Sequence, residues 1–473
     1  MRLAGRLKEK KTLIQLLDSS KSEFVAIYGR RRIGKTYLVN QIYGKEKFYF
    51  DFTGTPKISV RLQIKKFSMK FERVFNIKLP QKPKDWIEAF EEFEIQLEKH
   101  KSSKNKKIIF FDELPWLSSR NSGFLNALES FWNTYLSKRS DIILIVCGSA
   151  ASWMITHIVN NRGGLHNRLT RNLQLQPFTL YETREYFKLY NAQLTEEQIL
   201  EIYMAVGGVA YYLGLYEKGQ SAAQFINNVC FEGELQSEFE RLYESLFENY
   251  QTHMQIIRAL GKHREGLSQS QIADSLGLKS GGTLSKILSE LEISGFTLFT
   301  PQPYSKKKNG VYRLIDEYSL FYLNWIEPKG KTASDTQYWQ KQQGKTKYNT
   351  WSGFSFEIVC LRHLKEITKS LGISGLTTTS YSYRSPTAQI DLIVDRSDGI
   401  MNLCEIKYSK SNFTMNQSES AKIKQRQQEL IDIAQRKIQV FVVLITAHPA
   451  KKNQHYLNTF DSEVNLSDLF ATI

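Results

Sequence analysis

The sequence predicts an α/β protein with an N-terminal domain built on a parallel sheet, a helical middle region and a C-terminal α/β domain. Residues 24–28 form an apolar run of strand character, and a glycine-rich turn and a helical pattern follow it directly. Two more apolar runs, residues 107–111 and 142–147, each end in polar residues, as buried parallel strands do. Strand-like runs return at residues 389–395 and 401–407, after a polar stretch.

The glycine-rich turn matches the pattern G-x-x-x-x-G-K-[ST], and Tyr37 continues it into the helical pattern. Its residues are Gly29-Arg30-Arg31-Arg32-Ile33-Gly34-Lys35-Thr36. In such a loop the backbone N–H groups surround a β-phosphate at the positive end of a helix. Lys35 then bridges the β- and γ-oxygens, and the Thr36 hydroxyl ligates Mg²⁺. A chance glycine turn is the alternative, but the flanking strand and helix favour ATP as the ligand.

An acidic pair after the second strand predicts hydrolysis as well as binding. Asp112 and Glu113 follow residues 107–111 directly, at the strand end where open α/β sheets bind ligands. We expect Asp112 to hold Mg²⁺ and Glu113 to polarise the attacking water. A helix cap is the alternative role for this pair. The third strand ends at Ser149, which is placed to sense the γ-phosphate.

Length, composition and charge limit the number of domains, the cellular location and the kind of partner. A chain of 473 residues is too long for one hydrophobic core, so we expect about three domains. Four cysteines without paired spacing, and the lack of a signal core or a membrane-length apolar run, predict a cytoplasmic protein with no membrane contact. The net charge of +16 favours a polyanionic partner such as DNA, although a basic surface also serves solubility.

The N-terminal motifs resemble those of the archaeal-type ATPases of the AAA+/STAND group of P-loop ATPases. The similarity covers the phosphate loop and three further stretches, residues 111–117, 147–149 and 167–178. It implies an ATPase core over residues 1–178 and a helical lid over residues 179–248. This chain has Gly207-Gly208-Val209-Ala210 where the family usually carries Gly-Gly-x-Pro, which leaves in doubt how the lid reads the adenine ring.

The same resemblance assigns roles to arginines outside the loop. Arg6, in the segment of residues 3–9, belongs to the adenine pocket and would contact the nucleotide. Arg168, with Arg171 in reserve, is the candidate arginine finger or sensor. It would act on the nucleotide of its own subunit or, in a homo-oligomer, on that of a neighbour.

Residues 249–328 predict a winged-helix domain. Three helical patterns precede two strand-like runs, residues 296–299 and 311–314, which flank an Asn309-Gly310 turn. The third helix carries Glu290 and Glu292, which suits major-groove reading poorly, whereas Lys306, Lys307 and Lys308 in the turn are suited to phosphates. A packing or regulatory element is the alternative to a DNA-binding one.

Further candidate catalytic residues follow a polar stretch, which we interpret as a linker over residues 329–350. The domain of residues 351–473 begins with an apolar helix that carries Glu357, and its two strand-like runs carry Asp391, Glu405 and Lys407. We expect Asp391 and Glu405 to hold Mg²⁺ or Mn²⁺, which prefer oxygen ligands. Lys407 alternates to the same face as Glu405 and would orient water or stabilise the phosphate.

These four groups, in this order, resemble the PD-(D/E)xK nuclease superfamily. The resemblance implies that Glu357 is a helix acid and a metal ligand, and that the helix with Lys422, Lys424 and Arg426 contacts a nucleic-acid backbone. A Glu-Lys alternation is also common on solvated strands, and such folds are also kept as binding modules.

Two functions therefore stay open. The first is an ATP-hydrolysing switch coupled to a metal-dependent nuclease-like domain acting on DNA. The alternative is a non-nucleolytic, nucleotide-gated regulator that binds DNA or protein through the winged helix. A pure ATPase of the chaperone kind ranks third.

Overall fold

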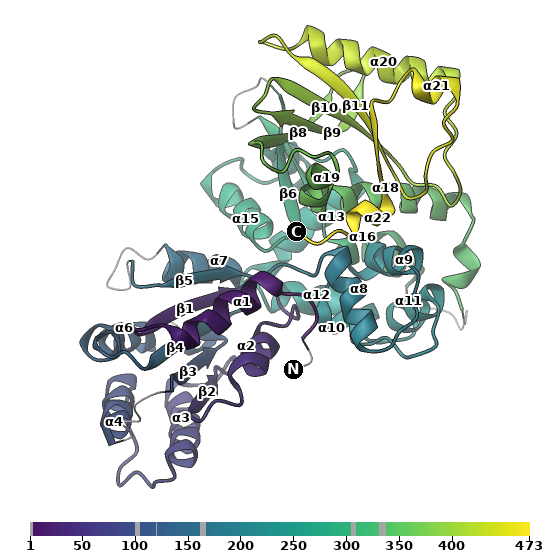
Figure 1. The fold of residues 1–473 in the computed structure, drawn as a ribbon. Helices are drawn as coiled ribbons and strands as arrows, with labels where there is room; N and C mark the ends of the chain where they lie inside the picture. The colour runs from purple at the N-terminus through teal and green to yellow at the C-terminus, as the bar shows by residue number, and fades with distance from the viewer. Residues whose placement is uncertain (1–2, 100–104, 120, 161–166, 304–308, 331–336) are drawn as a thin grey trace. The chain divides into compact units, whose positions relative to one another are not determined.

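The computed structural model describes residues 3–99, 105–119, 121–160, 167–303, 309–330 and 337–473 (Figure 1). Lys306, Lys307 and Lys308, expected to contact phosphates, lie outside these residues. The chain divides into two compact units, residues 1–176 and 177–473. Both units are mixtures of helices and sheet, in agreement with the predicted α/β class.

The first unit is built on a five-stranded sheet with the order β2-β3-β4-β1-β5. Every neighbouring pair is parallel. The strands are β1 (Glu23–Tyr28), β2 (Tyr49–Thr53), β3 (Lys107–Asp112), β4 (Ile142–Gly148) and β5 (Arg171–Gln174). All residues of β1, β3 and β4 are buried, which explains why these strands appear in the sequence as unbroken apolar runs. The order places β4 between the strand that precedes the phosphate loop and the strand that ends in Asp112.

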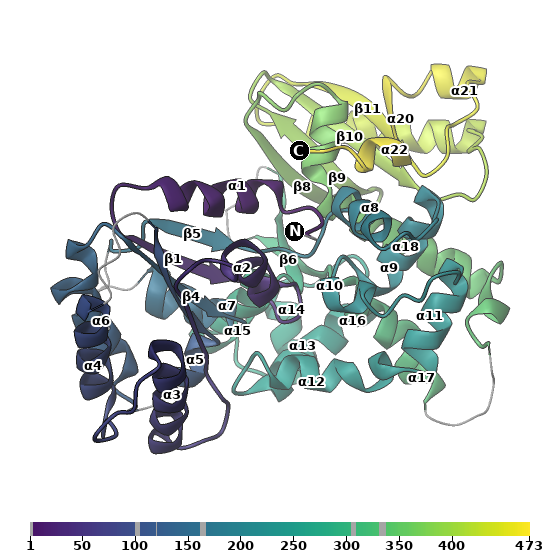
Figure 2. The same ribbon diagram turned by 60° about the horizontal axis from the view of Figure 1, so that its bottom comes forward.

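Helices cover this sheet, and one face carries a cluster of aromatic rings. The helices and turns are α1 (Leu7–Gln15), η1 (Leu16–Asp18), α2 (Lys35–Tyr43), α3 (Val60–Phe75), α4 (Trp86–Lys99), α5 (Leu114–Leu117), α6 (Phe124–Thr134), η2 (Leu136–Lys138), α7 (Ala151–Met154) and η3 (Ile155–Val159). α3 and α4 lie side by side in both views (Figure 2). Phe50 of β2 contacts Phe67 of α3 and Phe93 of α4 at ring-centroid distances of 5.5 and 4.7 Å. This packing fixes the edge strand β2 against α3 and α4.

The second unit begins with helices whose starts the sequence specifies well. They are α8 (Leu180–Leu189), α9 (Glu196–Val206), α10 (Ala210–Leu213), α11 (Ala222–Phe231), η4 (Glu234–Ser237) and α12 (Glu238–Glu244). Thr179, Thr195 and Ser221 each form a reciprocal capping box with a Glu or Gln three residues later. Each box satisfies backbone donors that the first turn of a helix leaves open.

Three helices and a hairpin follow. They are α13 (Tyr250–Lys262), α14 (Gln269–Leu276), α15 (Gly282–Ile293), β6 (Thr297–Pro301) and β7 (Gly310–Leu314). The two strands pair antiparallel, with Thr297 opposite Leu314. The order of these elements along the chain is the one that the sequence predicts for this region.

The region interpreted as a linker, residues 329–350, is in part packed into the core. It follows α16 (Glu317–Phe321), η5 (Tyr322–Ile326) and α17 (Glu327–Lys329), and it contains η6 (Gln340–Gln342). Trp339 and Tyr348 are fully buried, and Trp339 lies 5.1 Å from Trp325 and 5.2 Å from Trp351 between ring centroids. The stretch is polar in composition, but its few aromatic side chains fill a gap between helices.

A second five-stranded sheet, of order β12-β11-β10-β9-β8, completes the second unit. β8, β9 and β10 form an antiparallel meander, whereas β10, β11 and β12 are parallel. Helix α20 connects β10 to β11. The elements are α18 (Thr346–Arg362), α19 (Leu364–Ser370), β8 (Thr378–Arg384), β9 (Gln389–Arg396), β10 (Ile400–Lys407), α20 (Gln417–Asp432), β11 (Gln439–Thr446), α21 (Gln454–Leu457), β12 (Ser462–Asn465) and α22 (Leu466–Leu469).

Two general features of the described residues bear on the sequence expectations. Across the ranges given above, none of the helices combines the length and the apolar character needed to cross a bilayer. The four cysteines are free and buried, in line with the lack of paired spacing.

A buried histidine joins two distant helices of the second unit. His363 follows α18, and its Nε2 accepts a hydrogen bond of 3.0 Å from the backbone N–H of Leu180 at the start of α8. Its Nδ1 lies 2.7 Å from the carbonyl oxygen of Val359 and donates to it. Nε2 can accept this hydrogen bond only in a neutral ring, and burial lowers the pKa of His363 to about 4, although the contact with Val359 acts in the opposite direction.

We therefore expect acidification to weaken the second unit. Between about pH 6.5 and pH 4 the unfolded chain binds a proton at His363 that the folded chain does not bind, so stability falls as pH falls through this window. The loss attributable to this residue is up to about 3 kcal/mol. Chemical denaturation from pH 7 to pH 4.5 measures it. His363→Gln should flatten the pH slope even if it lowers stability at pH 7, whereas substitution of the exposed His157 by Gln should leave the slope unchanged.

Candidate functional site

The phosphate loop begins where β1 ends and closes on the start of α2. Three of its residues have positive φ: Gly29 (147°), Arg32 (70°) and Gly34 (91°). A Cβ on Gly29 would lie 2.2 Å from the carbonyl oxygen of Leu175, which follows the neighbouring strand β5. Glycine is therefore required at position 29 by its conformation and by the close approach of β5.

Lys35 lies inside the loop. Its side chain is buried, and Nζ donates to the carbonyl oxygens of Gly29 at 2.9 Å and Arg30 at 2.8 Å. A third hydrogen bond of 3.2 Å reaches the hydroxyl of Ser149, which follows β4. The ammonium group is thus held at the carboxyl ends of β1 and β4, where phosphate oxygens of a bound nucleotide would meet it.

Two carboxylates complete this edge of the sheet. The Thr36 hydroxyl donates to Asp112 Oδ2 at 2.6 Å. Glu113 accepts two hydrogen bonds from Ser149, one from the hydroxyl at 2.5 Å and one from the backbone N–H at 3.2 Å. Glu113 has a left-handed backbone conformation (φ 50°), which a non-glycine residue adopts at a cost and mostly where the surrounding structure demands it. Ser149 therefore connects Lys35 to Glu113.

The residues present fit a magnesium ion. The Thr36 hydroxyl and the Asp112 carboxylate are both oxygen donors, and they already lie within hydrogen-bond distance of each other. Mg²⁺ in phosphate sites takes one or two such protein oxygens and fills its other positions with water and phosphate oxygens.

The remaining loop residues differ in exposure. Ile33 and Arg30 are buried, Arg31 and Arg32 are half-buried, and Tyr37 is exposed. Arg6 is buried and donates to the carbonyl oxygen of Ile33 at 3.2 Å and to that of Gln176 at 2.6 Å. In this structure Arg6 supports the backbone of the phosphate loop.

Arg168 and Arg171 lie at the start of β5, away from the end of β1 where the phosphate loop begins. Arg171 begins β5 and pairs with Val25, three residues before the end of β1, and Arg168 lies in the exposed turn before it. Among the described residues, no hydrogen bond or ion pair joins either arginine to the loop. Within one subunit the structure does not bring the candidate finger to Lys35.

In the C-terminal domain, the pKa of Glu357 is raised by its surroundings. Glu357 projects from α18, and burial, followed by the negative charge of Asp391, raises the pKa of Glu357 to about 8. The positive charges of Arg313 and Lys407 act in the opposite direction. At neutral pH the Glu357 carboxyl is therefore protonated.

Asp391 lies in a β-bulge that was not predicted from the sequence. Tyr381 pairs with Ile393 and Tyr383 pairs with Ile390, so Ser382 alone is opposite both Asp391 and Leu392. Asp391 Oδ1 accepts a hydrogen bond of 2.9 Å from Gln389 Nε2. Its carbonyl oxygen accepts one of 3.4 Å from Arg313 Nη1 of β7.

Glu405 is held by two cations. Its Oε1 lies 2.8 Å from Lys407 Nζ, and its Oε2 accepts from Arg426 of α20 at 2.7 Å. Among the described residues, no group of three or more His, Cys, Asp or Glu side chains has the geometry to hold a metal ion. As they stand, Glu357, Asp391 and Glu405 are not grouped as the ligands of one ion, and both carboxylate oxygens of Glu405 contact cations.

Sequence reasoning missed Arg313, Arg384 and Glu265, which surround Asp391 or line the adjacent cavity. They belong to the β7 strand, the β8 strand and the α13–α14 connection. No motif joins residues so far apart in the sequence, and only the packing of the hairpin against the C-terminal sheet reveals their proximity.

The close approach at Gly29 gives a direct test of the loop. Gly29→Ala should lower ATP affinity at least about tenfold, because the added Cβ displaces either the loop or Leu175. The rise in melting temperature on addition of ATP and Mg²⁺ measures this. Gly375→Ala, where a Cβ would meet no atom within 4 Å, is the matched control and should keep the full ATP-dependent rise.

Comparison with known proteins agrees with this geometry. Residues 3–215 match the model of an ATPase domain predominantly from Archaea. An uncharacterized protein of Methanocaldococcus jannaschii, MJECL04, is 28% identical over 370 residues, which are 77% of each chain. Among solved structures, the Walker-type ATPase paby2304 of Pyrococcus abyssi superposes with a TM-score of 0.51 at 18% identity. This superposition covers 68% of this chain and 96% of that one. Residues 3–215 of this chain are thus similar to the archaeal-type ATPase domain, and they have an α/β P-loop fold.

Proposed function

We propose that this protein binds and hydrolyses ATP and that the bound nucleotide switches its state. The observation that carries this proposal is the hydrogen-bonded series Lys35–Ser149–Glu113 beside the Thr36–Asp112 pair. These residues come from three adjacent strand ends and supply a phosphate-binding cation, a phosphate sensor, a base and two metal-binding oxygens.

A bound nucleotide would replace some of these hydrogen bonds, and the replaced ones suggest how hydrolysis proceeds. The γ-phosphate oxygens accept from Lys35 and from Ser149, both of which now donate within the protein. Once Ser149 donates to the phosphate, Glu113 loses this donor and is available to accept a proton from the attacking water. Magnesium held by Thr36 and Asp112 would neutralise charge on the phosphate oxygens. Ser149 therefore couples phosphate binding to release of the base.

Arg168 fits this scheme as a residue that acts between subunits. Because Arg168 precedes β5, at the amino end of the strands, its own phosphate loop lies at the far end of the sheet. A role on ATP then requires a neighbouring copy of the chain, and hence a homo-oligomer.

Three substitutions separate binding from hydrolysis. Lys35→Ala should abolish both, whereas Glu113→Gln should keep ATP affinity and slow turnover about 10²–10⁴-fold, because only the proton acceptor is lost. Ser149→Ala should slow turnover with a smaller loss of affinity. Phosphate release and ATP binding measured on the same samples provide the comparison, with the exposed Glu91→Gln as the control. Equal loss of affinity and turnover in Glu113→Gln would contradict its assignment as the base.

For the C-terminal domain, the specific observation is its topology. The domain consists of an N-terminal helix, an antiparallel meander, a crossover helix and a parallel strand. Glu357 lies on the first helix, Asp391 on β9, and Glu405 and Lys407 on β10. This arrangement supports a nuclease-like domain. The cations that hold Glu405 suit a phosphate better than a metal ion.

This favours binding of DNA over its cleavage. It agrees with the alternative of a nucleotide-gated regulator, in which helices α13–α15 and the β6–β7 hairpin form a winged helix that contributes to binding.

Cleavage assays discriminate between the two functions. Linear, circular and single-stranded DNA should be bound but not cut in the presence of Mg²⁺ or Mn²⁺, with or without ATP. Cutting that is lost in Asp391→Ala, but kept in Asp398→Ala on the neighbouring β9–β10 turn, would establish the nuclease instead. The effect of Lys35→Ala on binding or cutting then measures control by ATP.

A further inference from the structure

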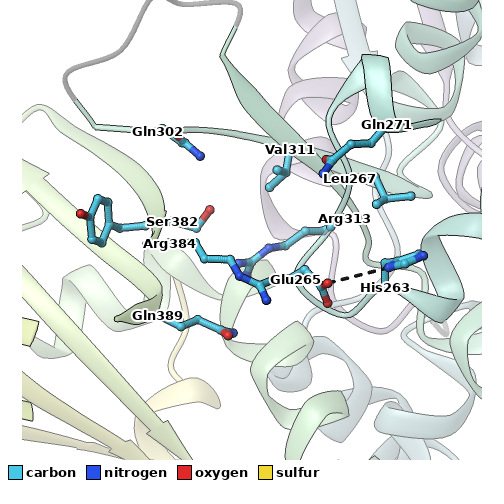
Figure 3. Close-up of a pocket in the computed structure, with 12 residues that line it drawn as sticks. His263, Glu265, Leu267, Gln271, Gln302, Val311, Arg313, Ser382, Arg384 and Gln389 are labelled. Atoms are coloured by element: carbon cyan, nitrogen blue, oxygen red, sulfur yellow. Dashed lines mark ion pairs between the residues drawn. The ribbon is translucent and has the colours of Figure 1, made fainter. Parts of the chain in front are cut away.

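A cavity of about 430 Å³ lies between the hairpin and the C-terminal sheet (Figure 3). Its walls come from the α13–α14 connection, from α14, from the β6–β7 hairpin and from β8 with the start of β9. This volume falls in the range of sites for small organic ligands and exceeds what one inorganic ion fills. All of these segments belong to the second unit.

Arg313 is the buried cation of this cavity. It is 7% exposed, and its Nη1 donates to the carbonyl oxygen of Asp391 at 3.4 Å. Its Nε is buried without a hydrogen-bond partner among the described residues. A guanidinium carries five N–H donors, and a buried charge with unused donors is costly unless a ligand completes it. Figure 3 shows the Arg313 side chain reaching towards Arg384 and Glu265.

A second arginine and one acid complete the charged lining. Arg384 of β8 is 55% exposed and pairs with Glu265 at 3.3 Å. His263 Nδ1 lies 3.8 Å from the same carboxylate. Among the residues that line the cavity, one carboxylate thus opposes two guanidinium groups, and Asp391, just outside the lining, places a further negative charge near Arg313. An anion that enters is attracted by Arg313 and competes with Glu265 for Arg384.

The uncharged residues of the lining could contact the base of a nucleotide as well as its phosphate. Gln271, Gln302 and Gln389 supply amides that donate and accept, and Leu267 and Val311 supply apolar surface. Such groups hydrogen-bond base edges and pack against the flat faces of bases. Gln389 also donates to Asp391, so the cavity adjoins the Asp391–Glu357 pair.

We propose that this cavity binds a nucleotide through its phosphate, with Arg313 and Arg384 as the phosphate ligands. Arginine suits this role because its planar fork donates two parallel hydrogen bonds to phosphate oxygens. Glu265 holds Arg384 in place until the phosphate arrives. The nucleotide is either free or part of a strand, and the second source rests on the proposed DNA binding by the C-terminal domain.

The test is binding of a 3′-fluorescein-labelled, 5′-phosphorylated oligothymidine to the full-length protein, followed by anisotropy in EDTA without ATP. Arg384→Ala should weaken binding about tenfold, in proportion to the loss of one charge-assisted contact. Arg436→Ala is the matched control, because Arg436, in the loop between α20 and β11, is also exposed and also pairs with one acid, Asp395 of β9. It should change affinity less than twofold. Glu265→Gln should tighten binding, because it removes the competing carboxylate.

Competition identifies the source of the nucleotide. Thymidine 5′-monophosphate lacks the β-phosphate that the phosphate loop binds, so it reports on the cavity alone. Displacement of the oligonucleotide by excess monophosphate, in the wild type and not in Arg384→Ala, indicates a free nucleotide as ligand. Lack of displacement indicates a strand phosphate.

Two results overturn the inference, and they are distinguishable. If the wild type binds the oligonucleotide and Arg384→Ala matches Arg436→Ala, the cavity assignment is wrong while DNA binding stands. If the wild type binds neither probe, the proposed DNA binding by the C-terminal domain fails as well. Arg313→Gln, with its melting temperature as a check on folding, should repeat the loss seen in Arg384→Ala.

Discussion

The buried ammonium of Lys35 is the constraint on which the N-terminal domain depends. Its three hydrogen bonds join the phosphate loop to the strand end at Ser149, and that contact requires β4 to lie directly beside β1. The same neighbour relation, continued from β4 to β3, brings Glu113 to Ser149. Without this strand order, Lys35 would have no hydrogen-bonded connection to Glu113. The strand order of the sheet thus determines which side chains meet at the phosphate loop.

Charge in the C-terminal domain is arranged differently. There Glu357 is protonated at neutral pH, and Glu405 is paired with Lys407 and Arg426. Each arrangement avoids leaving negative charge buried without compensation. The hairpin takes part, since Arg313 extends from β7 to the backbone of Asp391. The helical middle region and the C-terminal sheet therefore share one electrostatic environment, although they are separate stretches of sequence.

The sequence allowed the strands around the phosphate loop to be predicted, because a fully buried parallel strand is an apolar run and its polar end is visible beside it. The hairpin of residues 297–314 also follows from local pattern. Burial of Trp339 did not, since its neighbours are polar and only tertiary packing encloses it. The contact of Arg313 with Asp391 and the placement of Arg168 at the amino end of β5 are likewise set by topology, which no single segment encodes.

The bulge at Asp391 has a consequence for recognising related chains. In a regular strand, Asp391 and Leu392 would face opposite sides of the sheet, and one extra residue removes that alternation. In a relative without the bulge, the number of residues between the acid that corresponds to Asp391 and the strand that corresponds to β10 would differ by one. Searches that fix the number of residues between the acid and the Glu-x-Lys tripeptide would therefore separate chains that share the same three-dimensional site.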